Sequence, residues 1–593
     1  MLYPIENEIR EIKNLSGLWE FKVDLHNEGM ENEWQKCKLT DTIVMPVPAS
    51  YNDITTDAAV RDHIGDVWYQ RDFSIPRSWS DRRIVVRVGS ATHHAILWVN
   101  GQEVARHKGG FLPFEADITR RIEIGGANRI TLAVNNILDW SCLPSGEIKT
   151  YDETRYPSGF RTQETYFDFF NYAGIHRPVK IYTTPLSYIS DIKVVTDIDD
   201  GDGLIQYSVT THGEVSRVRV KLFDADHVLV AENAGHEGGL RVNKANLWEP
   251  GKGYLYHLVA EILGSDGNVE DSYQLPVGIR TVEVKGNQFL INGKPFYFKG
   301  FGKHEDSDIR GKGLDEAINV KDFSLMKWMG ANSFRTAHYP YSEEIMRLAD
   351  REGLVVIDEV PAVGMCFWSE TNTVFREDRV NATTLEHHLQ TVREMIARDK
   401  NHPCVVMWSI ANEAATNEEA ATPYFTKVAE LTRSLDSTRP ITIVNTMWPA
   451  VDKVSQLVDV ICINRYFGWY ADHGQLSVIE RHADLELKDW YEKFQKPIII
   501  AEYGADTIAG YHQLPAVSFS EEFQCDYLEQ FHKAFDQNDF VIGEHVWAFA
   551  DFATKQGLTR FGGNKKGIFT RQRQPKAAAF KLKERWTGNH SKW

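Results

Sequence analysis

Two kinds of hydrophobic pattern divide the 593-residue chain. Up to about residue 278, short apolar or alternating runs are separated by turn residues, which predicts β-strands and no long helix. From about residue 279, apolar runs alternate with stretches of helical spacing, such as Leu385–Arg398 and Ala421–Leu435. In the first stretch, Leu385, Leu389, Val392 and Ile396 recur at that spacing. The pattern therefore predicts β-domains followed by an α/β domain.

The β-rich part divides further at about residue 184. Residues 1–184 are expected to form a jelly-roll sandwich, and residues 185–278 an immunoglobulin-like β-sandwich, because many short strands between turn signals are typical of both. In the first part, strands are predicted at Leu18–Val23, Arg83–Val88, Ala95–Val99 and Ile130–Val134. In the second, they are predicted at Ile192–Val195, Leu204–Val209, Val218–Phe223 and Tyr256–Ile262.

Residues 279–593 contain apolar runs that read as strands buried on both faces. Such strands, alternating with helices, predict a (β/α)8 TIM barrel. The eight runs are Phe296–Gly300, Ser333–His338, Leu354–Val360, Val405–Glu413, Ile441–Asn445, Val460–Tyr466, Pro497–Tyr503 and Val541–Phe549.

Two of these strands deliver a glutamate where the apolar run stops, Glu413 with Asn412 beside it, and Glu502. Active sites of TIM barrels lie at the C-terminal ends of the strands. Two carboxylates there fit glycoside hydrolysis, in which one protonates the leaving oxygen and the other attacks the anomeric carbon or activates water. A separation of about 5 Å would indicate a retaining mechanism.

Other polar strand ends leave alternatives open. Asp358 and Glu359 compete as catalytic carboxylates, and a single glutamate at a strand end is often only an ion-pair partner. His338 is expected to be a wall residue rather than a metal ligand. Aromatic residues could wall a sugar, namely Tyr466, Tyr470 and Trp547. The basic loop at Arg560–Gly567 is either a solvated turn or a partner for a substrate carboxylate.

Composition narrows the choice of partners. The net charge of −17 argues against nucleic acid or an anionic membrane as the main partner. No apolar run is long enough to span a membrane, and no leader is visible at the N-terminus, so the compartment is not predicted. The six cysteines lack metal-ligand spacing, and Cys404 and Cys462 are expected to be buried thiols. We expect no metal and no cofactor.

Several motifs resemble those of glycoside hydrolase family 2, and within it the β-glucuronidases. In the barrel they are WSIANE, AEYGADTIAG, RTAHYPYSEE, VWAFADF and GGNKKGIFTR. In the first part of the chain, GQEVARHKGGFLPFEADIT and FDFFNYAGIHRPV are similar to the jelly-roll, sugar-binding-like domain of that family. The middle part is similar in position and length more than in motif.

The resemblance implies roles for individual residues. Glu413 matches the general acid/base, Glu502 the nucleophile and Asn412 a contact to the 2-hydroxyl. Asn564 and Lys566 match the element that binds the glucuronide carboxylate, which separates this subfamily from β-galactosidases and β-mannosidases. Other positions match sugar contacts, namely Asp168, His338, Tyr466, Tyr470, Trp547 and Arg560.

The resemblance thus implies a retaining exo-β-D-glucuronidase acting on small glucuronides, and a homotetramer. A β-galactosidase or β-galacturonidase is the alternative within the family, and a non-catalytic carbohydrate-binding protein is a third possibility. Residues 365–381 form a short segment where some bacterial relatives carry a long loop over the cleft. Aglycone preference is therefore not predicted.

Overall fold

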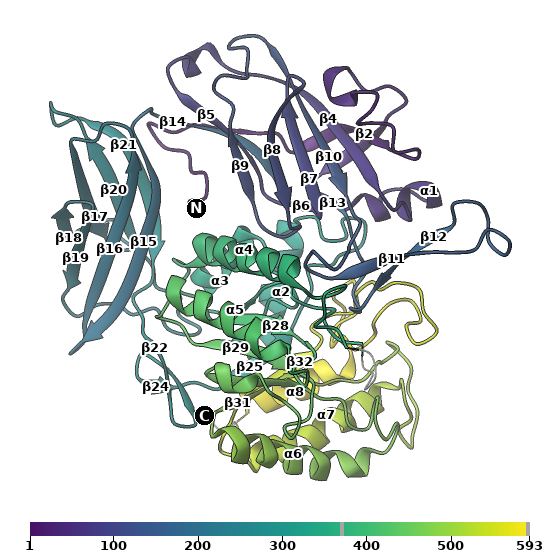
Figure 1. Ribbon diagram of the computed structural model, residues 1–593. Coiled ribbons are helices and arrows are strands. Elements are labelled where there is room, and N and C mark those ends of the chain that lie inside the picture. The colour runs from purple at the N-terminus through teal and green to yellow at the C-terminus, as the bar shows by residue number, and fades with distance from the viewer. Residues whose placement is uncertain (368–372, 589–593) are drawn as a thin grey trace.

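A computed structural model of the chain describes residues 1–367 and 373–588. Figure 1 shows two β-sandwiches packed against a barrel of strands surrounded by helices. This confirms the expected multidomain architecture. The division of the chain at residues 184 and 278 remains a prediction. Part of segment 365–381, residues 368–372, lies outside the described residues.

The first domain is a sandwich of a four-stranded sheet, β1-β14-β5-β9, and a six-stranded sheet, β3-β2-β4-β10-β7-β8. Inward-facing residues such as Val86, Leu97 and Leu132 are fully buried and join the two sheets. The elements are β1 (Ile12–Asn14), β2 (Gly17–Val23), β3 (Ile43–Val47), α1 (Ala58–Arg61), β4 (Asp66–Ser74), β5 (Arg83–Val88), β6 (Ala91–Thr92), β7 (His94–Val99), β8 (Gln102–Lys108), β9 (Phe114–Asp117), β10 (Ala127–Asn135), β11 (Gly146–Thr150), β12 (Arg161–Thr165), β13 (Gly174–Ile175) and β14 (Val179–Thr184).

The second domain packs sheet β15-β16-β19 on sheet β18-β17-β20-β21. Along β17, Val218, Val220 and Leu222 are buried and alternate with more exposed residues, as the period-two pattern predicts. The strands are β15 (Tyr188–Asp199), β16 (Asp202–His212), β17 (Arg217–Phe223), β18 (Leu229–Ala234), β19 (Glu237–Val242), β20 (Tyr256–Leu263) and β21 (Val269–Val277).

The third domain begins with a small antiparallel sheet, β22 (Val282–Lys285), β23 (Gln288–Ile291) and β24 (Lys294–Pro295). A closed parallel barrel follows, and each of its strands overlaps one of the eight predicted runs. The barrel strands are β25 (Phe298–Gly302), β26 (Ser333–Arg335), β27 (Val355–Glu359), β28 (Val405–Asn412), β29 (Ile441–Asn445), β30 (Val460–Asn464), β31 (Ile498–Glu502) and β32 (Val541–Trp547).

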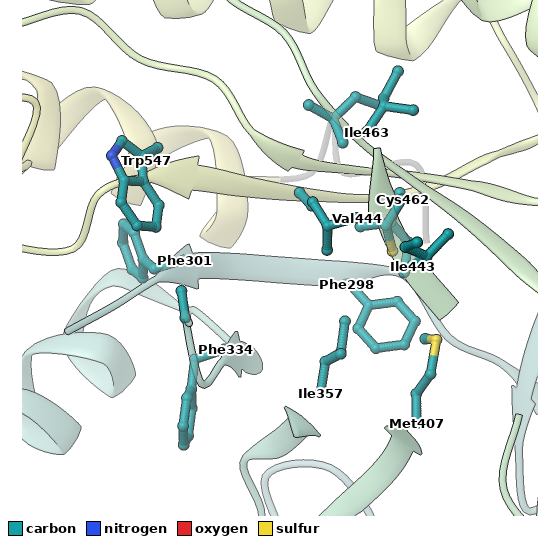
Figure 2. Packing of buried hydrophobic residues seen from close by; sticks show 14 of the residues in the cluster. Phe298, Phe301, Phe334, Ile357, Met407, Ile443, Val444, Cys462, Ile463 and Trp547 are labelled. Carbon is teal, nitrogen blue, oxygen red and sulfur yellow. The ribbon is translucent and has the colours of Figure 1, made fainter. Parts of the chain in front are cut away.

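Apolar side chains fill the barrel. Figure 2 shows Phe298, Ile357 and Met407 lying together, with Ile443 and Cys462 close by. Cys404 and Cys462 are both fully buried and unbridged, as expected. Because the strands are covered on both faces, their polar residues concentrate at the ends, where a site can form.

Helices surround the barrel (Figure 1). They are α2 (Glu316–Met329), α3 (Glu343–Glu352), α4 (Ala382–Asp399), α5 (Ala421–Leu435), α6 (Ile479–Phe494), α7 (Glu521–Asp536) and α8 (Ala577–Thr587). The predicted helical stretches lie in α4 and α5. Among the described residues, no helix is both long and apolar enough to span a lipid bilayer.

The first domain reaches the barrel through the loop that follows the β11–β12 hairpin. Phe169 forms a bridge with Thr554, and the Phe170 N–H donates to the carbonyl of Ala553 at 2.8 Å. These backbone contacts bring the neighbouring Asp168 to the mouth of the barrel.

Candidate active site

A cavity of about 720 Å³ lies at the C-terminal ends of the barrel strands. Its walls come from loops after the strands and from the first-domain loop that carries Asp168. The lining residues are Tyr166, Phe167, Asp168, His338, Val363, Gly364, Cys366, Phe367, Asn412, Glu413, Thr446, Trp448, Asn464, Arg465, Tyr466, Phe467, Tyr470, Ala471, Glu502, Trp547 and Arg560.

Glu502 ends β31 and is only 4% exposed. Its Oε1 accepts a hydrogen bond from the Arg335 guanidinium, and its Oε2 accepts one from the Tyr466 hydroxyl at 2.6 Å. His338 Nε2 lies 3.7 Å from Oε1. Two donors, one of them cationic, fix the orientation of this carboxyl group.

Glu413 follows β28 directly and has φ of 53°, in the left-handed region. Its Oε1 accepts a hydrogen bond from Asn464 Nδ2 at 2.8 Å. Burial first, and then the negative charge of Glu502, raise the pKa of Glu413 from 4.5 to about 8, while the Asn464 bond acts in the opposite direction. A carboxyl that stays protonated at neutral pH therefore faces the same cavity as Glu502 and feels its charge.

The structure separates this pair from the competing carboxylates. Glu359, at the end of β27, is fully buried and accepts hydrogen bonds from Arg335 at 2.7 Å and Ser409 at 2.7 Å. Burial would raise the pKa of Glu359, but the Arg335 cation, together with His338 and Ser409, outweighs it and lowers that pKa. Asp358 is fully buried and accepts from the Thr336 hydroxyl at 3.0 Å. Neither Asp358 nor Glu359 lines the cavity.

Arg335 lies in the barrel next to the cavity and pairs with two of the carboxylates. It ends β26, is fully buried and bonds both Glu502 and Glu359. Burial would lower its pKa, but these two carboxylates raise it. His338 Nδ1 lies 3.1 Å from Glu359 Oε1, and the His338 ring stacks on Trp547 with centroids 5.0 Å apart.

Asn412 connects Arg335 with Asn464. It is 1% exposed, and its Oδ1 accepts from Arg335 at 3.4 Å and from Asn464 at 3.3 Å. Because Asn464 also donates to Glu413, one network of side-chain amides connects Asn412 to Glu413.

The loop after β32 meets the first domain at the cavity rim. Asp168 accepts hydrogen bonds from Arg560 Nε at 2.7 Å and from Asn564 Nδ2 at 2.7 Å. Arg560 and Asp168 line the cavity, whereas Asn564 is 1% exposed and lies behind them. Asp168 thus fixes two of the basic-loop residues that the sequence singled out.

Lys566 is fully buried and forms an ion pair with Asp506. Burial would raise the pKa of Asp506, but the Lys566 and Arg560 cations lower it. The Tyr470 hydroxyl oxygen accepts from Lys566 Nζ at 2.8 Å and from Arg560 Nη2 at 2.5 Å. Two cations therefore converge on one oxygen at the edge of the cavity, so the Arg560 and Lys566 side chains are paired rather than solvated.

Outside the cavity, one group of described residues could hold a metal ion, namely Asp350, His402 and Cys404. It precedes β28 and so lies at the end of the barrel opposite the cavity. Asp350 Oδ2 is 2.5 Å from His402 Nδ1, and Asp350 Oδ1 accepts from the Cys404 N–H at 3.0 Å. These groups already bond one another and are remote from Glu413 and Glu502.

Three family models together cover nearly the whole chain. The TIM barrel domain of glycosyl hydrolases family 2 matches residues 282–590, the sugar binding domain of that family matches residues 12–185, and a third model of the family matches residues 187–280. The chain belongs to glycosyl hydrolase family 2.

Relatives within family 2 are similar along their full length. A beta-glucuronidase of Paenibacillus borealis is 59% identical over 99% of this chain and 98% of its own. A human beta-glucuronidase is 49% identical over 99% of this chain and 92% of its own.

Solved structures of family 2 proteins superpose closely on the chain. A beta-D-glucuronidase of Dictyoglomus thermophilum is 54% identical with a TM-score of 0.95, and the match covers 99% of each chain. A Ruminococcus gnavus β-glucuronidase in complex with D-glucuronic acid is 41% identical with a TM-score of 0.93, again over 99% of each chain.

Three residues of this family 2 site were missed by sequence reasoning, namely Arg335, Asn464 and Asp506. Each lies in or beside a predicted barrel strand, so a polar residue near a strand end was the available signal. Their partners lie far along the chain, and Glu502 comes 167 positions after Arg335. Only the closed barrel reveals those pairs.

Proposed function

We propose that this chain is a retaining exo-β-D-glucuronidase that hydrolyses small β-D-glucuronides to glucuronic acid and an aglycone. The proposal is supported by its membership in family 2, by full-length relatives named beta-glucuronidase, and by the structure of one relative with D-glucuronic acid. It is supported independently by the chemistry of the cavity.

In the proposed mechanism, the Glu413 carboxyl donates its proton to the glycosidic oxygen as the bond to the anomeric carbon breaks. The Glu502 carboxylate attacks that carbon and forms a covalent glycosyl-enzyme. Glu413, now ionised, removes a proton from water, which attacks the anomeric carbon and releases Glu502. Arg335 and Tyr466 hold the Glu502 side chain in position through their hydrogen bonds. The chemistry needs no metal or cofactor.

The main structural support for a glucuronide as the substrate is that Arg560 and Lys566 both donate to the Tyr470 hydroxyl oxygen. An oxygen that accepts from two cationic donors occupies a position that suits a carboxylate oxygen of a uronic acid. We propose that Asn564, Lys566 and Arg560 bind the glucuronide carboxylate, with Tyr470 at its edge. A neutral sugar would gain much less from these charges.

The remaining expected contacts complete the proposed subsite. Asn412 would donate to the 2-hydroxyl, Tyr466, Trp547 and His338 would contact the ring, and Asp168 would orient the cationic loop. Aromatic side chains suit this task because their apolar faces pack against sugar C–H groups while polar tips bond hydroxyls.

A panel of 4-nitrophenyl glycosides tests the proposal. We expect kcat/KM for the β-D-glucuronide to exceed that for the β-D-glucoside and the β-D-galactoside by orders of magnitude. A preference for the β-D-galactoside or the β-D-galacturonide would instead support the alternative within family 2. No turnover of any glycoside by folded protein would favour a non-catalytic carbohydrate-binding protein.

We also propose that the protein assembles as a homotetramer, an expectation that rests on resemblance alone. Sedimentation equilibrium of the purified chain tests it. A mass four times that of the chain is expected, and a monomer or dimer across micromolar concentrations would contradict it.

A further inference from the structure

A lysine of the barrel domain inserts into the first domain behind the cavity. Lys312 lies in the turn between β25 and α2, and its N–H donates to Ser50 Oγ at 3.0 Å, while the Ser50 N–H donates to the Arg310 carbonyl at 2.9 Å. A Cβ on Gly311 would lie 2.6 Å from Ser50 Oγ, and one on Gly313 would lie 2.5 Å from the Cα of Ala49. Two glycines therefore permit this close approach.

The Lys312 side chain is 6% exposed and ends among three aromatic rings. Its Nζ lies 3.8 Å from the ring centroid of Tyr339, 4.1 Å from that of Phe169 and 5.0 Å from that of Phe111. Phe111 and Phe169 belong to the first domain, whereas Tyr339 belongs to the barrel. A cation at these distances attracts the faces of rings from both domains and draws the domains together.

Two of the three rings are adjacent in sequence to residues of the cavity. Phe169 follows Asp168, and Tyr339 follows His338. Asp168 in turn accepts from Arg560 and Asn564, which are the proposed carboxylate-binding residues. A displacement of the Phe169 ring would move Asp168 and these two donors with it.

The burial of this cation is not explained by an ion pair. Among the described residues, no carboxylate oxygen lies within 4.0 Å of the Lys312 ammonium nitrogen. Burial lowers the pKa of Lys312 to about 7, with Arg177 acting in the same direction and the more distant charges of Glu305 and Asp306 opposing it. A methionine would fill similar space without desolvating a charge. Stability alone therefore does not account for a lysine here.

We propose that Lys312 is a positioning residue for glucuronide recognition, whose ammonium holds the Phe169 ring against the Tyr339 ring and so sets Asp168 at the cavity rim. The role rests on the proposed function, because Asp168 matters to it only as the support of Arg560 and Asn564. It predicts an effect specific to substrates that carry a carboxylate.

The test compares kcat and KM of Lys312→Met with those of the unaltered protein on the 4-nitrophenyl glucuronide and on the matching glucoside. We expect kcat/KM on the glucuronide to fall about tenfold, mainly through KM, with little change on the glucoside. Lys312→Arg should recover most of the loss. The thermal midpoint of Lys312→Met should not fall.

Two further variants separate positioning from general loosening. Arg87→Met removes a contact across the same domain boundary away from the cavity, where Arg87 Nη2 donates to Glu343 Oε2 at 2.7 Å, and should leave KM unchanged. In a background of Asp168→Asn, the Lys312→Met change should have no further effect, since both act through Asp168.

Equal losses on the two glycosides, an unchanged KM for Lys312→Met, or a full additional loss in the Asp168→Asn background would each overturn the role of Lys312. If Asp168→Asn lowers kcat/KM on the glucuronide while Lys312→Met leaves it unchanged, only the role of Lys312 is overturned. Wild-type kinetics for Asp168→Asn overturn the proposed carboxylate site as well. If Lys312→Met does not fold, Phe169→Leu, which removes one ring, is measured in the same way with the same outcomes.

Discussion

Replacing Glu413 with glutamine removes the proposed proton donor while keeping a side chain that can bond Asn464. With a pKa of about 8, Glu413 is about 90% protonated at pH 7, whereas a carboxyl at its ordinary value of 4.5 would be protonated in well under about 1% of molecules. Burial beside Glu502 therefore raises the population of the acid roughly 300-fold. General acid catalysis contributes on the order of 10²–10⁴ in rate.

The assay pairs substrates whose leaving groups differ in their need for a proton. We expect Glu413→Gln to lower kcat/KM on methyl glucuronide by about 10²–10⁴ and to have a much smaller effect on 2,4-dinitrophenyl glucuronide. In the unaltered protein, kcat/KM should fall above about pH 8, because Glu413 loses its proton there. The variant should lack that alkaline fall.

The matched control is Glu419→Gln, an exposed glutamate in the same loop that pairs with Lys453. It should leave both the rates and the pH profile unchanged. Equal losses of Glu413→Gln on the two glucuronides, or an alkaline fall that persists in the variant, would refute the assignment of Glu413 as the acid.

Further predictions concern the carboxylate site, the acid and the domain boundary. Lys566→Ala should lower kcat/KM on the 4-nitrophenyl glucuronide far more, about 100-fold, than on the glucoside; equal losses would show that Lys566 does not bind a carboxylate. Asn464→Ala should move the alkaline limb up by about one pH unit, since its hydrogen bond lowers the pKa of Glu413; a downward shift contradicts this. Burial would raise the pKa of Glu343, but the Arg87, Arg398 and Arg347 cations together outweigh it and lower that pKa from 4.5 to about 2. The stabilisation by these three cations, roughly 3 kcal/mol, is thus present above about pH 4.5 and lost toward pH 2. Denaturant unfolding of Glu343→Gln should show a deficit at neutral pH that shrinks in acid, and a constant deficit would contradict it.

The architecture was accessible from the sequence because each barrel strand carries its own local signal. The run Ile441–Asn445 and strand β29 coincide, and the predicted helix Ala421–Leu435 coincides with α5. Strand ends were less accurate, since Ser333–His338 contracts to β26 at Arg335. Hydrophobic periodicity reports burial, but hydrogen bonding to neighbouring strands decides where a strand stops.

The sequence by itself also placed Glu413 and Glu502 at the ends of buried strands. A glutamate that follows an apolar run is a local pattern, which can be recognised without knowing which residues it contacts. The strand pattern could not choose between them and Asp358 or Glu359, whereas the resemblance to the family 2 motifs favoured Glu413 and Glu502. The tertiary structure separated these carboxylates, because burial beside Arg335 holds Glu359 away from the cavity.

Contacts between distant parts of the chain were decided only by the tertiary structure. Asp168 meets Arg560 across two domains, and Lys312 reaches Phe169 through a turn that two glycines allow. Local periodicity carries no information about such pairs, because they depend on how whole domains pack. The sequence thus determined the strands and the acids at their ends, and packing decided which charges face one another.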